Sequence, residues 1–186
     1  AYVGIDNHSA GRTAAYLIAT ALGDISGHVL TSRSNDRFLG EEAREGAFKQ
    51  TLNRKSPQLQ IVGVSGGSGV HFETSNMMAQ AVSGLEKLRA VYSMGGGNRT
   101  ILNILDQHGL KPDVFVAHDL DVDNRGLIES GQINFVLHHD LKIDLENVFQ
   151  AFLHHHKLVP LAPQNTISHV QVVTPKNIPS RVTVTL

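Results

Sequence analysis

The chain has 186 residues, of which 16 are Lys or Arg, 17 are Asp or Glu, and 41% are hydrophobic. This composition is typical of a globular protein, and the near-zero net charge excludes a general attraction to nucleic acid or to an anionic membrane. The absence of cysteine excludes disulfides, thiolate metal sites and a cysteine nucleophile. No apolar run approaches the roughly 20 residues that would cross a bilayer.

Short apolar runs alternate with amphipathic segments of helical length. The runs predict strands at 2–5, 28–31, 59–64, 90–93, 113–117, 133–137 and 169–174. The intervening segments predict helices at 9–22, 38–52, 74–85, 98–108, 121–129 and 144–157. Because the strands are apolar on both faces, helices are expected on both sides of the sheet. The sequence therefore predicts an α/β fold with a doubly wound, mostly parallel sheet.

Ligands of such folds bind beyond the carboxyl ends of the strands. Small polar residues and amides follow nearly every predicted strand, among them Asp6, Asn7, Ser32, Ser34, Asn98, His118, Asp119, His138 and His139. Such groups suit a neutral ligand with many hydroxyls, which needs directional hydrogen bonds. Arg44 could point its planar fork into the same crevice, or it could pair on the surface with Glu41, one helical turn away.

Other chemistries have weaker support. The glycine loops 65–69 and 95–97 each precede a helix and could cradle a phosphate, but neither has the spacing of a P-loop or of a dinucleotide fingerprint. We interpret them as tight turns. His118, Asp119, Asp121 and Asp123 could hold a metal or serve an enzyme, but the EF-hand glycine and distal glutamate are absent. We expect no cofactor and no resident metal.

Several segments together resemble the lac repressor family of bacterial regulators, whose core is a periplasmic-binding-protein-like module. Residues 3–15 are similar to its D-N-x-x-A-G-R-x-A-A segment, and Arg44 with Phe48 to its R-x-x-G-F segment. Residues 114–119 resemble its V-V-G-x-D strand end, 133–140 a strand that crosses between two subdomains, and 172–179 its closing strand and tail. The resemblance covers nearly the whole chain in the right order.

The resemblance implies ligand contacts for Arg44 and Asp119, and for His139 where the family usually has Gln. Ala47 replaces a usual Gly, and 95–98 replaces an Asn-Asp pair, so Asn98 could contact ligand or cap its helix. Phe72 is the expected aromatic partner of a sugar face, since the chain has no Trp. A neutral His139 can both donate and accept, so we expect ligand affinity to weaken at acidic pH.

The resemblance also implies an organisation. Residues 1–137 would form the C-terminal subdomain of a ligand-binding core, 138–165 would belong to a partly missing second subdomain, and 166–186 would be the return strand and tail. On the helix of 144–157 we expect an unpaired apolar stripe. The chain begins at Ala1 with a strand, so we expect it to begin within a longer protein.

The implied function is the effector-binding part of a cytoplasmic homodimeric regulator. Its partners would be a small sugar-like effector and DNA, the latter only through an N-terminal domain absent from this chain, with no membrane partner. A secreted sugar receptor of a transporter shares the same core and stays open as an alternative. An α/β enzyme using His118 and Asp119 is the third hypothesis.

Overall fold

The structure, a computed structural model, describes residues 2–34, 38–66 and 71–180, and for residues 71–74 it describes the backbone only. Its strands are β1 (Gly4–Ile5), β2 (Gly27–Arg33), β3 (Leu59–Ser65), β4 (Leu88–Ser93), β5 (Val114–His118), β6 (Phe135–His138), β7 (Ile167–Ser168) and β8 (Gln171–Val173). Its helices are α1 (Asn7–Leu22), α2 (Leu39–Lys55), α3 (His71–Val82), α4 (Asn98–Gln107), α5 (Val122–Glu129) and α6 (Leu141–His155).

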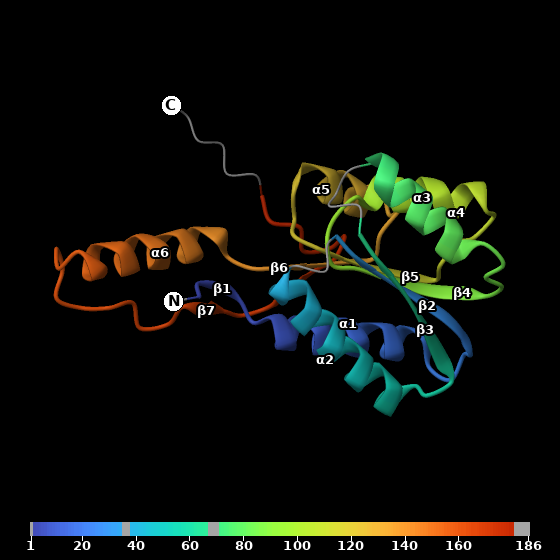
Figure 1. The fold of residues 1–186 in the computed structure, drawn as a ribbon, viewed down its shortest axis with the longest axis horizontal. Coiled ribbons are helices and arrows are strands. Elements are labelled where there is room, and N and C mark those ends of the chain that lie inside the picture. The colour runs from blue at the N-terminus through green and yellow to red at the C-terminus, as the bar shows by residue number, and fades with distance from the viewer. Residues whose placement is uncertain (1, 35–37, 67–70, 181–186) are drawn as a thin grey trace.

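Six strands form one sheet in the order β3-β2-β4-β5-β6-β8, parallel except for β8, which runs antiparallel to β6. Helices α1 and α2 cover one face, and α3, α4 and α5 cover the other (Figure 1). Adjacent residues of a strand point to opposite faces, so Val29 packs in one core cluster and Leu30 in the other. The predicted doubly wound α/β fold is confirmed, and we call this part the body.

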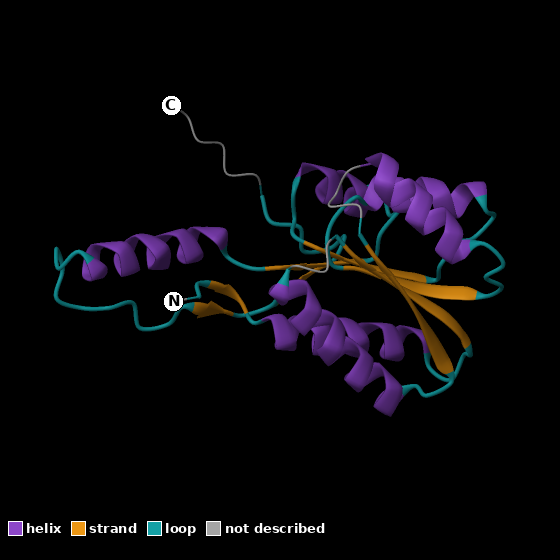
Figure 2. Ribbon diagram, viewed as in Figure 1, coloured by secondary structure: helices purple, strands orange, loops and turns teal. Residues whose placement is uncertain are grey.

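A second, smaller part extends away from the body (Figure 2). It consists of β1, α6, β7 and the loop 156–166, and we call it the arm. Strand β1 pairs in parallel with β7, and this two-stranded sheet is separate from the six-stranded one. The chain passes between body and arm around residues 6, 139 and 170, so the junction has three crossings.

The arm accounts for the main differences from the sequence prediction. The strand expected at 169–174 is present as the shorter β8, which pairs in the body, and a second short strand that was not expected, β7, precedes it and pairs in the arm. Strand β1 likewise joins the arm and not the main sheet. Helix α6 begins three residues earlier than expected, since the Asp140 carboxylate accepts from the backbone N–H groups of Lys142 and Ile143.

The predicted apolar stripe on α6 is exposed. Leu145, Val148, Phe149 and Phe152 are each about half or more exposed to solvent. No helix among the described residues is long and apolar enough to span a membrane. The proposed boundaries at 137/138 and 165/166 stay a prediction.

Candidate functional site

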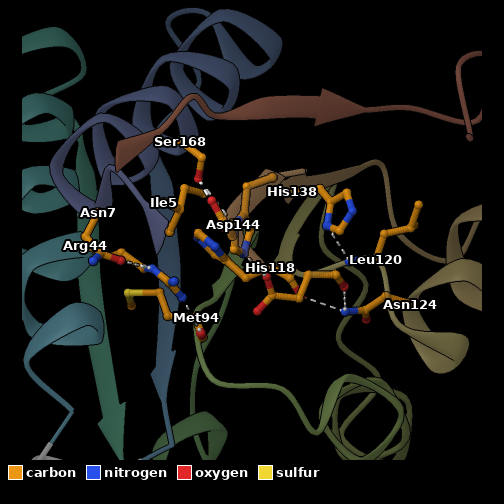
Figure 3. A network of polar contacts seen from close by, with 12 residues as sticks. Ile5, Asn7, Arg44, Met94, His118, Leu120, Asn124, His138, Asp144 and Ser168 are labelled. Carbon is orange, nitrogen blue, oxygen red and sulfur yellow. Dashed lines mark hydrogen bonds and ion pairs between the residues drawn. The ribbon is translucent and has the colours of Figure 1, made fainter. Parts of the chain in front are cut away.

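Polar side chains gather where the carboxyl ends of the parallel strands meet the arm (Figure 3). They come from the start of α1, from α2, from the ends of β4, β5 and β6, and from α6 and β7. Parallel strands end at the same edge of a sheet, so residues far apart in sequence converge there. The structure thus places these polar groups beyond the carboxyl ends of the strands, where the sequence predicted them.

Arg44 lies on α2 and is oriented by two acceptors from different elements. Its Nε donates to Asn7 Oδ1 at 2.7 Å, and its Nη1 donates to the Met94 carbonyl oxygen at 3.2 Å. The alternative pairing with Glu41 is not formed, since the Glu41 carboxylate accepts from the backbone N–H and the hydroxyl of Ser34. A guanidinium has five N–H donors, and the described partners use two of them. The others can serve a ligand oxygen.

His118 and Tyr92 form a buried pair next to Arg44. The Tyr92 hydroxyl lies 2.8 Å from His118 Nε2, and Tyr92 also packs against Phe48. Burial, with smaller electrostatic contributions from Arg44 and His139, holds the pKa of His118 well below its ordinary value. Burial also raises the pKa of Tyr92, which Arg44 only partly offsets. Both side chains are therefore neutral around pH 7, and they do not supply a charged acid or base.

The buried His118 predicts a pH-dependent stability. In the unfolded chain, His118 binds a proton as the pH falls through about 6.5, whereas burial disfavours this proton in the native state. The native state is therefore stabilised by the neutral His118 above pH 6.5 and loses stability as the pH falls below that value. One such group contributes a slope of up to about 1.4 kcal/mol per pH unit.

Urea unfolding between pH 5 and 7.5 measures how the free energy of unfolding depends on pH. In His118→Phe this dependence is expected to be smaller, by the amount that uptake of about one proton on unfolding contributes. Tyr92→Phe is the control, because it leaves the buried imidazole in place and should keep the slope. His138, whose pKa is also lowered mainly by burial, accounts for part of the remaining dependence. An unchanged slope in His118→Phe would show that His118 is not buried in its neutral form.

Asp119 is held in an unusual backbone conformation at the end of β5. Its φ of +63° lies in the left-handed region, which is uncommon for residues other than Gly. The Asp119 N–H donates to the Leu137 carbonyl oxygen, and Asn124 Nδ2 donates to the carbonyl oxygens of both His118 and Asp119. The surroundings thus fix the backbone, while the Asp119 carboxylate is about half exposed and free to meet a ligand.

His139 lies at the crossing from β6 to α6, and its side chain is mostly buried. Its Nε2 is 3.6 Å from Asp119 Oδ1, and its Nδ1 forms a short contact with Asp144 Oδ2. Arg44 bonds to the end of β4, which pairs with β5, and His139 lies beside Asp119 at the end of β5, so Arg44, His139 and Asp119 border one region. Three of the five predicted site residues are therefore brought together.

The other two predicted residues are placed differently. Asn98 is buried and donates from Nδ2 to Asn124 Oδ1 at 2.6 Å, which supports the loop that carries Asp119. It does not cap α4, because Gly97 occupies the cap position in a left-handed conformation. A ligand contact of Asn98 stays a prediction. Phe72 belongs to α3, but its side chain lies outside the described residues.

The first glycine of the loop 95–97 serves packing. A Cβ added at Gly95 would lie 2.6 Å from the Ser34 Cβ, so the backbone passes too close to residue 34 for a side chain at this position. The loop 65–69 falls largely outside the described residues. Among the described residues, no group of three or more His, Asp or Glu side chains is arranged to hold a metal ion. His118 faces Tyr92 and not a second metal ligand.

Two hollows lie along the junction of body and arm. The larger, about 410 Å³, is lined by Asp140, Ile143, Asn147, Gln164, Asn165, Ile167, Ser168, His169 and Gln171. The smaller, about 290 Å³, is lined by Tyr2, Ile5, Asp6, Asn7, His8, Leu39, Gly40, Ala43 and Ile167. Asn7, which orients Arg44, borders the smaller hollow, and Ser168, next to His139, borders the larger. The polar cluster thus has one of the two hollows on each side of it.

The geometry defines an α/β domain in which hydrogen-bond donors and acceptors gather at the junction of two parts. The sequence matches the periplasmic binding protein domain over residues 1–142, and the chain belongs to this family. No curated protein matches the chain closely enough to be informative.

Solved structures of this fold are similar over nearly the whole chain. AraP, an arabinose-binding protein from Geobacillus stearothermophilus, is 22% identical with a TM-score of 0.74, covering 93% of this chain and 62% of its own. GanP, a glucose-galactose binding protein from the same organism, is 16% identical with a TM-score of 0.79, covering 97% and 64%. A solute-binding protein from Actinobacillus succinogenes with bound D-allose is 17% identical with a TM-score of 0.75, covering 94% and 61%. The chain thus spans somewhat under two thirds of these proteins.

Sequence reasoning missed three members of the cluster. Tyr92 looks like an ordinary core residue of a strand, and Asp144 like a first-turn carboxylate of a helix. Asn7 was noticed only as a polar residue after a strand, although it orients Arg44. Of the three, only Asn7 had a usable signal, its place in the D-N-x-x-A-G-R segment.

Proposed function

We propose that this chain forms one side of a cleft that binds a neutral sugar and that it is not an enzyme. The observation that carries the proposal is the convergence of a half-buried Arg44, an exposed Asp119 carboxylate and His139 at the junction of body and arm. Guanidinium donors and carboxylate acceptors together match hydroxyl groups, which both accept and donate. Similar solved structures are named for arabinose, glucose-galactose and allose, which supports the same ligand class.

A thermal-shift screen of the full-length protein tests this proposal. Millimolar L-arabinose, D-galactose, D-glucose and D-allose are the probes, and at least one is expected to raise the melting temperature because it binds the native state only. Glucose 6-phosphate is the control, because the exposed Asp119 carboxylate would repel its negative charge. A shift with the phosphate and none with any neutral sugar would contradict the proposal.

For the whole protein, we propose the effector-binding region of a cytoplasmic, homodimeric transcriptional regulator that contacts DNA through a separate domain. The support is the resemblance of residues 3–15, 114–119 and 172–179 to the lac repressor family. A ligand would act by binding one arrangement of the two parts more tightly than the other. Dimerisation and DNA binding are parts of this proposal.

A solute receptor of a sugar transporter is the second candidate, and the names of the similar solved structures favour it. The two candidates differ in compartment. Release of the native full-length protein by osmotic shock would favour the receptor and contradict the regulator. Retention in the cytoplasm, with sugar-dependent binding to DNA from its own upstream region, would support the regulator.

A further inference from the structure

The residue that α6 buries is an acid. Of the fifteen residues of this helix, Asp144 is the buried one, at 8% exposure, whereas Phe149 and Leu145 are more than 60% exposed. Burial of a carboxylate costs free energy unless hydrogen bonds or charges compensate for it. The helix therefore buries an acidic residue and exposes its apolar ones, the reverse of the usual distribution.

Asp144 reaches across the junction to the candidate site. Its Oδ2 accepts from His139 Nδ1 in the short contact, and the Ser168 hydroxyl lies 3.4 Å from the same oxygen. The other carboxylate oxygen, Oδ1, is buried without a hydrogen-bond partner among the described residues. A buried carboxylate with one oxygen lacking a hydrogen bond lowers the stability of the fold, so stability alone does not explain Asp144. Its one close partner is a site residue.

Capping of α6 does not explain Asp144. The cap is Asp140, whose carboxylate already accepts from two backbone N–H groups of the first turn. The first turn of a helix suits a carboxylate because of the helix dipole, and an ionised acceptor makes a stronger hydrogen bond to His139 than a neutral one. The charge is thus directed at the imidazole.

The contact has a consequence for the opposite side of the ring. An acceptor at Nδ1 requires a proton there, so in the neutral imidazole Nε2 keeps its lone pair. Nε2 then faces Asp119 Oδ1 at 3.6 Å, beyond hydrogen-bond distance, with two acceptors side by side. Hydroxyl donors of a ligand would complete this arrangement.

We propose that Asp144 is a positioning residue of the binding site: from the arm, it fixes the proton on His139 Nδ1 so that Nε2 and the Asp119 carboxylate act as paired acceptors for sugar hydroxyls. The proposal rests on the proposed sugar-binding function. It also gives the arm a direct role in the site, because the body supplies Asp119, whereas the arm supplies Asp144 and Ser168.

Nitrogen NMR of the His139 ring in this chain tests whether Asp144 fixes the proton on Nδ1. The wild type is expected to carry a proton on Nδ1. Asp144→Asn is expected to shift the proton towards Nε2, because an amide can donate to Nδ1 and so stabilise the wrong tautomer. Asp140→Asn is the matched control: it changes a carboxylate in the same turn, keeps a good cap and should leave the tautomer unchanged. A proton on Nε2 in the wild type at pH 7.5, in a neutral or in a doubly protonated ring, would overturn the proposal.

A double-mutant cycle in the full-length protein tests whether Asp144 affects sugar binding through His139. The ligand is the sugar that gives the largest thermal shift. Asp144→Asn is expected to weaken its affinity about tenfold or more. In a His139→Gln background the same change is expected to be silent. An equal loss in both backgrounds would mean that Asp144 acts structurally, which overturns the proposal. If no sugar binds any variant while the NMR result holds, the sugar-binding function fails and the positioning of His139 stands.

Discussion

Replacing Gly11 by alanine is expected to lower the free energy of unfolding by about 3 kcal/mol, at the upper end of the range for overpacked cores. Gly11 lies on α1 where this helix crosses α2. A Cβ at this position would overlap the backbone carbonyl oxygen of Arg44 and would lie 3.0 Å from the Phe48 nitrogen. Backbone atoms inside a helix cannot rotate away as a side chain can, so α1 and α2 would have to separate.

Gly46→Ala is the matched control for this prediction. Gly46 is also a helical glycine, on α2 itself, but an added Cβ would meet no atom of the described residues within 4 Å beyond its chain neighbours and its own helix backbone. Alanine there is expected to raise stability by about 0.5–1 kcal/mol, because it restricts the unfolded chain and favours the helix. Urea unfolding of both variants gives the comparison. Equal stabilities for the two would mean that α1 and α2 do not make the close crossing described here.

The sequence predicted the body well because its strands carry a local pattern. Strand β5 is buried along its whole length, so it reads as a continuous apolar run bounded by Pro112 and a polar loop. The helices between the strands have amphipathic faces that fill the two core clusters. Fold class follows from such alternation without knowledge of any long-range contact.

The arm was harder to predict for a physical reason. Strands β1 and β7 have two residues each and lie more than 160 positions apart in sequence. Two residues show no period, and neither strand exists without its partner. Asp144 was missed for the same reason, since its partner His139 is defined by how α6 leaves β6 and not by a motif. Arg44 and Asp119 were predicted because each lies in a segment with a family resemblance.

Arg44→Ala is expected to abolish the rise in melting temperature that a bound sugar produces in the full-length protein. The substitution removes the guanidinium donors left over after Asn7 and Met94 are served. Hydrogen bonds from a charged donor contribute about 1.5–3 kcal/mol each, so loss of one or two weakens binding by about a hundredfold. A ligand present at 100 times its Kd stabilises the native state by about 2.7 kcal/mol, and almost all of this would disappear.

Two further variants separate the fork geometry of Arg44 from its charge. Arg44→Lys keeps the charge but replaces the planar fork with a single ammonium group, which cannot donate to Asn7, Met94 and a ligand in the same directions. We expect an intermediate loss of the sugar-induced shift. Arg54→Ala, at an exposed position on the last turn of the same helix, removes an equal charge and should leave the shift intact. A full shift in Arg44→Ala would place the ligand away from Arg44, because the guanidinium is held between Asn7 and the end of β4 and cannot be replaced there by alanine.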